Sequence, residues 1–301
     1  MRILVTGATG FVGQSLVPAL LEAGHDVRAL SRSREKATAV LDPAVTVYEG
    51  DVLDPTSLEP ALAGVDVAFY LVHSLGSGTE YADLDRRAAD TFAAAASEAG
   101  LERVIYLGGL GETGDDLSAH LASRRAVETR LAAGTYELTT FRAAIIVGAG
   151  SASFEMVRQL VTRLPVMITP KWVRTPAQPI AIDDVVEYLV RAVETPETAG
   201  MTLEIGGPEV LSYEEMMRRT AAAMGRRLVI LPVPILSPTL SVYWIDLVTD
   251  TPPSISHPLI EGLKNPVVVT DETAQALLAV ERTPFDEAVA RAVAVADTGE
   301  E

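Results

Sequence analysis

His120 and Arg124 lie four residues apart in the stretch "SAHLASRRAVE", and together they could move a proton. An imidazole has an ordinary pKa of about 6.5, so it can donate or accept a proton near neutral pH. The segment 120–132 is predicted to be helical, which places Arg124 one turn after His120. A guanidinium at that distance lowers the imidazole pKa and favours the neutral ring. The two residues are therefore candidate catalytic groups; the alternative is that His120 only caps or fills the helix.

A glycine-rich turn near the start of the sequence indicates a second kind of chemistry, the binding of a diphosphate. In "VTGATGFVG", Gly7, Gly10 and Gly13 follow an apolar strand and open a helix. Gly7 allows the tight turn, Gly10 lets the backbone approach a pyrophosphate, and Gly13 permits close packing of helix on strand. The N-terminus of that helix offers free N–H groups and a positive dipole end. This context after the first strand predicts a dinucleotide site.

The end of the second predicted strand indicates which dinucleotide is bound. NAD sites usually place an acidic residue there, on the ribose 2'-hydroxyl. This chain instead has "ALSRSREK", which offers Ser31 and Arg32 and, further on, Arg34 and Lys36. Cations without a carboxylate suit a 2'-phosphate, so NADP is favoured and NAD is the second candidate. For Arg34 and Lys36, a role as solvated surface charges is the preferred interpretation.

These residues must be positioned by an α/β fold. Short apolar runs alternate with helical patterns through the first half of the chain, which predicts a doubly wound parallel sheet. The predicted strands are "RILVTG", "DVRALS", "VTVYEG", "DVAFYLV", "RVIYLGG" and "LTTFRAAIIVG". The predicted helices cover residues 11–23, 57–62, 82–99 and 120–132.

The alternation of apolar strands with helical patterns ends after residue 150. This change predicts a smaller C-terminal lobe that binds the substrate. We expect residues 1–150 to form the nucleotide-binding domain with 176–206 returning to it, and 151–175 and 207–297 to form the lobe. Ser212 and Glu215 have the spacing of a capping box at a helix start. Prolines at 232, 234 and 238 exclude one long helix from the apolar segment 228–263, so an irregular structure is expected. That segment is compatible with a closed pocket, a long-chain substrate or peripheral contact with a membrane.

Composition excludes several classes of function. The chain has 301 residues, no cysteine and a net charge of −17, which argues against disulfides, a thiolate nucleophile and a nucleic-acid partner. Its few lysines and acidic surface are typical of proteins from salt-loving organisms. The N-terminus "MRILVTGATG" has no signal-peptide pattern, and no run reaches the roughly 20 apolar residues of a membrane span, so a cytoplasmic location is expected.

Four motifs along nearly the whole chain carry a family resemblance. With "TGATGFVG", "GDVLDP", "RVIYLGGLG" and "PIAIDDV", the sequence resembles the extended and atypical short-chain dehydrogenase/reductases. Within that superfamily, the series "YLVHSL", "YLGGLG", "HLASR" and "VMITPKWVRT" is similar to the NmrA-like NAD(P)H-binding group related to the nucleotide-binding accessory subunit of respiratory complex I. The resemblance implies a Rossmann domain. It also implies that Asp51 and Val52 contact the adenine, and that Leu71, Val72 and His73 line the nicotinamide-ribose side. The cofactor-binding set predicted on this basis is Gly7, Thr9, Gly10, Phe11, Val12, Gly13, Ser31, Arg32, Asp51, Val52, Leu71, Val72, His73, Leu107, Gly108 and Arg124.

The catalytic positions of that family are occupied by other residue types. The resemblance places His120 where the family has its tyrosine and Arg124 where it has its lysine. Gly108 and Gly109 stand in place of the serine after the fifth strand. Arg124 could still hold a ribose hydroxyl or a phosphate, as the lysine does. The "DD" at Asp183 and Asp184 is interpreted as a helix N-cap, and no metal site is expected.

Three functions are compatible with this pattern. The first is an NADP(H)-dependent oxidoreductase acting on an apolar carbonyl or quinone-like compound without the Tyr–Lys pair, since the cofactor supplies the hydride chemistry. The second is a non-catalytic nucleotide-binding subunit or redox sensor, which the missing triad favours. Sugar-nucleotide epimerisation or dehydration ranks last, because it needs the absent tyrosine and lysine.

Overall fold

The computed structural model describes residues 1–74, 81–111, 117–232, 248–263 and 265–298, without the side chains of 171, 172, 232, 297 and 298. Its centre is a sheet of seven parallel strands in the order β11-β6-β5-β4-β1-β2-β3. The chain moves outward from β1 in one direction and then in the other, so the predicted doubly wound α/β fold is confirmed. The strands are β1 (Arg2–Thr6), β2 (Asp26–Ser31), β3 (Thr46–Glu49), β4 (Val67–Tyr70), β5 (Arg103–Gly109), β6 (Glu137–Ala143) and β11 (Thr202–Ile205).

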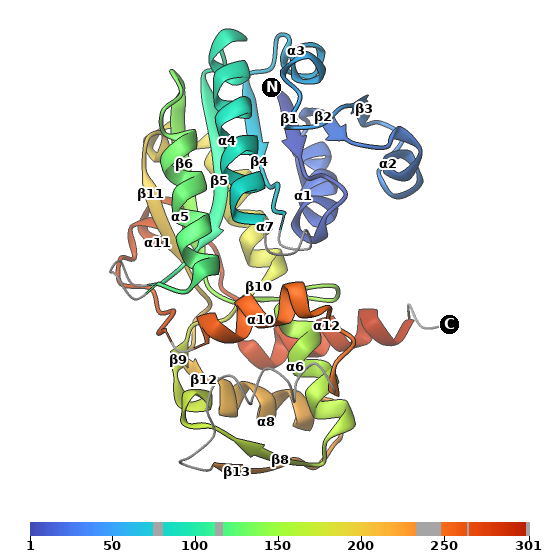
Figure 1. The fold of residues 1–301 in the computed structure, drawn as a ribbon, viewed down its shortest axis with the longest axis vertical. Helices are drawn as coiled ribbons and strands as arrows, with labels where there is room; N and C mark the ends of the chain where they lie inside the picture. Colours follow the sequence, from blue (N-terminus) through green and yellow to red (C-terminus); the bar gives the residue numbers. More distant parts are fainter. Residues whose placement is uncertain (75–80, 112–116, 233–247, 264, 299–301) are drawn as a thin grey trace.

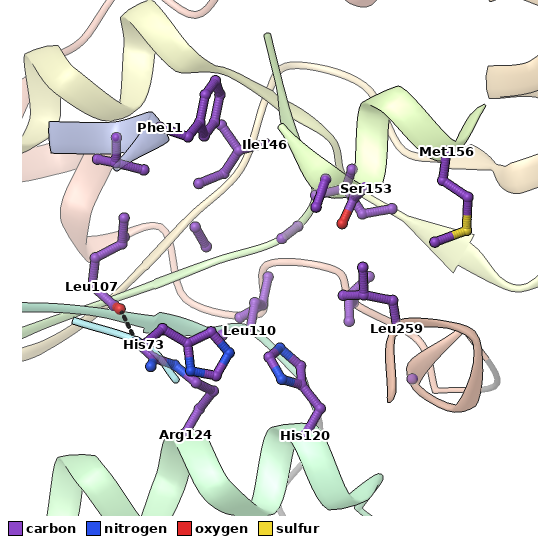
Figure 2. A pocket seen from close by; sticks show the side chains of 18 of the residues that line it. Phe11, His73, Leu107, Leu110, His120, Arg124, Ile146, Ser153, Met156 and Leu259 are labelled. Carbon is purple, nitrogen blue, oxygen red and sulfur yellow. Dashed lines mark hydrogen bonds between the residues drawn. The ribbon is translucent and has the colours of Figure 1, made fainter. Parts of the chain in front are cut away.

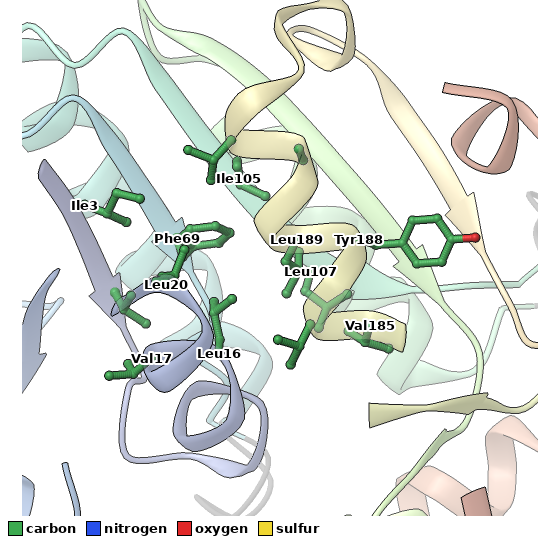
Figure 3. Close-up of a cluster of buried hydrophobic side chains, with 14 of the residues drawn as sticks. Ile3, Leu16, Val17, Leu20, Phe69, Ile105, Leu107, Val185, Tyr188 and Leu189 are labelled. Atoms are coloured by element: carbon green, nitrogen blue, oxygen red, sulfur yellow. The ribbon is translucent and has the colours of Figure 1, made fainter. Parts of the chain in front are cut away.

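Helices cover both faces of this sheet (Figure 1). On one face α1 (Phe11–Glu22), α7 (Ile182–Glu194) and α11 (Thr273–Leu278) pack over a core that includes Ile3, Leu16 and Phe69 (Figure 3). On the other face lie α3 (Pro55–Leu62), α4 (Tyr81–Glu98) and α5 (Ala119–Leu131), around Tyr70, Phe92 and Tyr106. Burial of both faces explains why the strands are near-continuous apolar runs.

A second lobe lies below the carboxyl ends of the strands in Figure 1. Its helices are α6 (Ala152–Arg163), α8 (Tyr213–Ala223), α10 (Pro253–Gly262) and α12 (Phe285–Thr298), which share their own apolar core. Short strand pairs complete the lobe and its junction with the sheet. These are β7 (Ile146–Val147) with β10 (Ile180–Ala181), β8 (Val166–Thr169) with β13 (Val229–Pro232), and β9 (Pro176–Ala177) with β12 (Leu211–Ser212). Residues 171–174 and 196–198 form single 3-10 turns.

The structure confirms some of the local predictions made from the sequence and contradicts others. The capping box of α8 is present, with the Ser212 hydroxyl accepting from the Glu215 N–H. Helix α2 (Arg34–Val40), capped by Ser33, was not predicted. The N-cap interpretation of Asp183 and Asp184 is wrong, because α7 is preceded by Ala181 without a side-chain cap. Of the segment 228–263, predicted to be irregular, residues 233–247 lie outside the described residues, and the prediction is wrong for its two ends, where β13 and α10 form.

The two aspartates instead tie α7 to the C-terminal elements. Asp184 is buried and accepts hydrogen bonds from the backbone N–H of Thr283, at 2.8 Å, and from its hydroxyl, at 2.7 Å. Asp183 forms an exposed ion pair with Arg291 at 2.8 Å. Within the described residues no helix is both long and apolar enough to span a membrane.

Arg103 gives a test of the packing at the edge of the sheet. It is 7% exposed. Its guanidinium donates to the Ala192 carbonyl at 2.7 Å, to the Thr139 hydroxyl at 2.8 and 3.0 Å, and to Thr198. These bonds join β5, β6 and the end of α7. Arg103→Met should lower the free energy of unfolding by about 3 kcal/mol, because it leaves buried acceptors without donors.

The measurement is urea unfolding, with Arg130→Met as the matched control. Arg130 pairs with Asp90 at 3.3 Å on the surface, where both side chains are 49% exposed. An exposed pair of this kind is worth about 0.5 kcal/mol. Equal losses in the two variants would contradict a structural role for Arg103.

Candidate functional site

The turn between β1 and α1 is shaped by its glycines. Gly7 has φ +77°, and a Cβ there would lie 2.9 Å from the Leu71 carbonyl oxygen. A Cβ on Gly13 would lie 2.3 Å from the Gly7 carbonyl oxygen, so α1 packs on the turn with no room for a side chain. A Cβ on Gly10 would meet only the Gly7 oxygen, at 3.2 Å, and is otherwise in open space. The geometry at these three glycines is therefore the one that their predicted roles require: a tight turn, an open backbone and close packing of the helix.

The open side of Gly10 adjoins the N-terminus of α1. Gly10 is the N-cap, with φ −81° and ψ 173°, and no acidic residue stands in the first turn. The first N–H groups of a helix have no partner within it and carry the positive end of the helix dipole. An anionic group can thus approach the backbone at Gly10, Phe11 and Val12, which is the arrangement that a diphosphate requires.

The predicted adenosine side lies at the carboxyl ends of β2 and β3. Arg32 is exposed and has no ion pair among the described residues. Val52 is buried, and the Asp51 carboxylate accepts the Leu53 N–H at 2.9 Å, which shapes the turn after β3. The Ser31 hydroxyl turns to its own loop at Ser33, and the Glu49 carboxylate at the end of β3 accepts the Arg34 N–H at 3.2 Å.

A cavity of about 530 Å³ extends from the glycine turn into the second lobe. Of the predicted cofactor residues, it is lined by Gly7, Gly10, Phe11, Val12, Gly13, Leu71, His73, Leu107, Gly108 and Arg124. Thr9, Ser31, Arg32, Asp51, Val52 and Val72 do not line it, and their contact with a cofactor stays a prediction. The wall from the second lobe was not predicted residue by residue: it comprises Ala152, Ser153, Met156, Val157, Leu160, Tyr213, Met217, Leu259, Gly262 and Leu263.

His120 lies in the first turn of α5 and faces this cavity (Figure 2). Its Nδ1 is buried and has no hydrogen-bond partner among the described residues. Burial, followed by the neighbouring His73 and Arg124, lowers the pKa of His120 to about 3. The direction agrees with the effect expected from Arg124, although burial is the larger cause. At neutral pH the His120 ring is therefore uncharged. It can form hydrogen bonds, but it is not an imidazolium that could act as an acid.

Arg124 is buried one turn further along α5, at 7% exposed. One of its terminal nitrogens donates to the Leu107 carbonyl at 2.7 Å, and its guanidinium lies 4.9 Å from the centre of the Tyr106 ring. The other terminal nitrogen has no partner among the described residues. A buried guanidinium nitrogen without an acceptor, in a residue that lines the cavity, is suited to a ribose hydroxyl or another ligand oxygen.

Gly108 and Gly109 leave little space for the serine of the related dehydrogenases. A Cβ on Gly109 would lie 2.9 Å from a methyl group of Leu121, and one on Gly108 would lie 3.0 Å from the Tyr106 ring. Helix α5 therefore packs closely against the end of β5. Neither position carries a carbonyl-polarising hydroxyl, and a side chain at either would press on Leu121 or Tyr106.

The sequence did not predict one polar contact of the site, which joins His73 to Asp85. The His73 Nδ1 lies 2.8 Å from one carboxylate oxygen of Asp85, and the other oxygen accepts the Ser74 N–H at 2.8 Å. Asp85 is 1% exposed. The signal was an acid at position 85 in the helical series Tyr81, Ala88, Ala89 and Phe92, all of which are buried. An acid within such a stripe needs a polar partner.

The part of the chain that the structure describes contains no group of three His, Asp or Glu side chains able to hold a metal ion. The polar groups at the cavity are thus two histidines, one arginine and few hydroxyls, on otherwise apolar walls. Such a site can hold an anionic cofactor at one end and an apolar molecule at the other.

Known structures of similar fold bind nicotinamide cofactors. The chain resembles a Citrobacter triphenylmethane reductase solved with NADP(H), with a TM-score of 0.78, 21% identity, and 96% of this chain and 99% of that chain covered. An NADPH-dependent quinone oxidoreductase from Escherichia coli gives a TM-score of 0.77 at 18% identity, covering 95% and 98%. These likenesses show that the chain shares the fold of those two reductases.

Sequence relatives are named as reductases. A 2-alkyl-3-oxoalkanoate reductase of Stenotrophomonas maltophilia is 33% identical over 188 residues, which is 54% of this chain and 54% of that protein. A ceramide reductase of Caulobacter vibrioides is 30% identical over 236 residues, covering 77% and 74%. The aligned region is thus about half the length of the first relative and about three quarters of the second. The model of the NmrA-like family matches residues 1–249, and the chain belongs to that family.

Proposed function

We propose that the protein is an NADP(H)-dependent oxidoreductase that reduces a carbonyl or quinone-like group on an apolar substrate, without the Tyr–Lys pair. The observation that carries this proposal is the single cavity that runs from the glycine turn at Gly10 to the apolar wall of α6, α8 and α10. The names of the two relatives, one an oxoalkanoate reductase and one a ceramide reductase, support an apolar substrate that contains a reducible group.

The residues present fit a nicotinamide dinucleotide. The open face of Gly10 leaves space for a diphosphate against the start of α1. The unpaired nitrogen of Arg124 would hold a ribose hydroxyl on the nicotinamide side. Ser31 and the exposed Arg32 favour a 2'-phosphate over a free 2'-hydroxyl, so NADP is the proposed cofactor and NAD the second candidate. When bound, the cofactor would supply hydride transfer.

The chain's own residues would orient the substrate and keep water out. Met156, Leu160 and Met217 form a wall that takes an apolar group, and Leu259 and Leu263 of the α10 region face it. Burial of apolar surface stabilises such a substrate by about 25 cal/mol per Å². The neutral His120 can form a hydrogen bond with the substrate oxygen at the edge of this wall.

The proposal predicts tighter binding of NADPH than of NADH and turnover with apolar ketones or quinones. Calorimetric titration should give a dissociation constant at least tenfold lower for NADPH. The loss of NADPH absorbance should then be followed with 3-oxo compounds of increasing chain length and with quinones, and kcat/KM should rise with the apolar length.

Two results would decide against it. Binding of NADPH without turnover on any of these compounds would favour a nucleotide-binding subunit or redox sensor. Preference for NADH would overturn the role given to Arg32. Arg32→Ala serves as the matched variant and should weaken NADPH binding about tenfold without changing NADH binding.

A further inference from the structure

Besides His120 and Arg124, the structure contains a histidine–carboxylate pair, His73 and Asp85. His73 follows β4 and Asp85 belongs to α4, so the pair joins two elements that end beside the cavity. The separation of 2.8 Å between Nδ1 and the carboxylate is that of a direct hydrogen bond. Because the second carboxylate oxygen is held by the Ser74 N–H at 2.8 Å, the carboxylate has a fixed orientation.

This contact determines the tautomer of the ring. The ionised carboxylate can only accept, so Nδ1 of His73 carries the hydrogen and Nε2 has the free lone pair. Nε2 is buried and has no hydrogen-bond partner among the described residues. The pair therefore leaves one basic nitrogen available in a cavity-lining residue. In this respect it resembles the histidine and aspartate of hydrolytic triads.

The neighbours of His73 support a role with the ligand. Its ring lies 5.2 Å from the ring of His120, and the two rings are close beside Arg124 in Figure 2. All three residues line the cavity. The groups that act on the charge of His73 are Asp85 and Arg124, and the rings of His120 and Tyr81 also face it, at 5.2 and 6.4 Å.

We propose that His73 is a catalytic residue whose imidazolium form donates the proton on Nε2 to the substrate oxygen, and that Asp85 is the positioning residue that holds its ring. The inference rests on the proposed function. As the carbonyl is reduced, the O–H bond forms while the Nε2–H bond breaks, and solvent then returns the proton to Nε2. When bound, the reduced cofactor would supply the two electrons and the hydrogen on carbon.

The surroundings of the two histidines affect their pKa values differently, and this favours His73 as the proton donor. Burial and the charge of Arg124 lower the pKa of His73, but the hydrogen bond and charge of Asp85 oppose them. His120 has no carboxylate partner, and its pKa falls to about 3. The hydrogen bond to Asp85 therefore favours the imidazolium form at His73, whereas His120 has no such partner and stays neutral. For reduction, kcat/KM should increase as pH falls towards the pKa of His73, below 6.5.

Two measurements on the whole chain test this proposal: NMR of the histidine ring nitrogens and steady-state kinetics. Long-range proton–nitrogen spectra distinguish the tautomers, and His73→Gln assigns the signal among four histidines. We expect the Nδ1–H form in the wild type, and in Asp85→Asn a loss of that preference with a further fall in the pKa of His73. Asp83→Asn is the matched control on α4, since Asp83 is exposed and pairs only with Arg86 among the described residues.

The kinetic arm uses the ketone that gives the highest rate with NADPH. His73→Gln should lower kcat/KM about 100-fold and flatten its pH profile. Asp85→Asn should shift that profile to lower pH, and Asp83→Asn should leave it unchanged. An Nε2–H ring in the wild type, or full activity with an unaltered profile in His73→Gln, overturns the inference alone. A wild type that binds NADPH but reduces no carbonyl compound overturns the proposed function and the proton transfer with it, while the spectra still decide whether Asp85 holds the ring.

Discussion

Replacement of Gly10 by valine is expected to weaken NADPH binding about 100-fold, equivalent to about 2.7 kcal/mol. The branched side chain would stand between the N-terminus of α1 and the diphosphate, in the space that Gly10 leaves open. The fold should be nearly unaffected, because φ is −81° at this position and any residue can adopt it. Calorimetric titration gives the affinity, and thermal unfolding shows whether the protein remains folded.

Gly10→Ala provides the graded comparison. Its Cβ would lie 3.2 Å from the Gly7 oxygen and should cost less affinity than valine. A Gly10→Val protein that is folded and binds NADPH as tightly as the wild type would show that the diphosphate lies elsewhere.

Replacement of Ser153 by phenylalanine is expected to lower kcat/KM for long-chain ketones about 100-fold while the affinity for NADPH changes less than about threefold. Ser153 lies on α6 and faces the cavity from the side opposite His73 and Arg124 (Figure 2). The added ring would occupy the region proposed for the apolar group of the substrate, and the lost contact area accounts for roughly 2–3 kcal/mol. The measurement is steady-state kinetics over a series of chain lengths.

Two comparisons isolate the effect of the added volume. Ser153→Ala removes only the hydroxyl and measures its own contribution. Short ketones should lose less activity than long ones in Ser153→Phe. An equal loss at every chain length would contradict the assignment of this wall to the apolar part of the substrate.

The sheet was predictable because its strands are marked by composition alone. Strands such as Ile3–Val5 and Val104–Tyr106 are buried on both faces and contain uninterrupted apolar runs. Helix α2 escaped prediction because its seven residues, "REKATAV", contribute only one buried side chain and so have no apolar stripe. The aspartates at 183 and 184 were misread since a helix start can be recognised from sequence within a residue or two at best.

The candidate site also has parts that the sequence predicts and parts that it does not. The glycine turn and the pair His120 and Arg124 are local features, so their spacing was enough to find them. The wall is formed by α6, α8 and α10, three separate segments of the sequence between residues 152 and 262. Sequence periodicity does not predict contacts between such distant segments. Asp85 was recognisable only as an acid on the buried stripe of α4, and its partner His73 comes from another element.

A structure of the complex with NADP(H) tests the central claim most directly, because every role assigned here depends on where the nucleotide lies. We predict that the diphosphate oxygens accept hydrogen bonds from the backbone N–H groups at the start of α1, with the 2'-phosphate towards Arg32 and the nicotinamide between Gly108 and the two histidines. A nucleotide bound outside the glycine turn, or turned so that the nicotinamide points away from His73, would contradict the account.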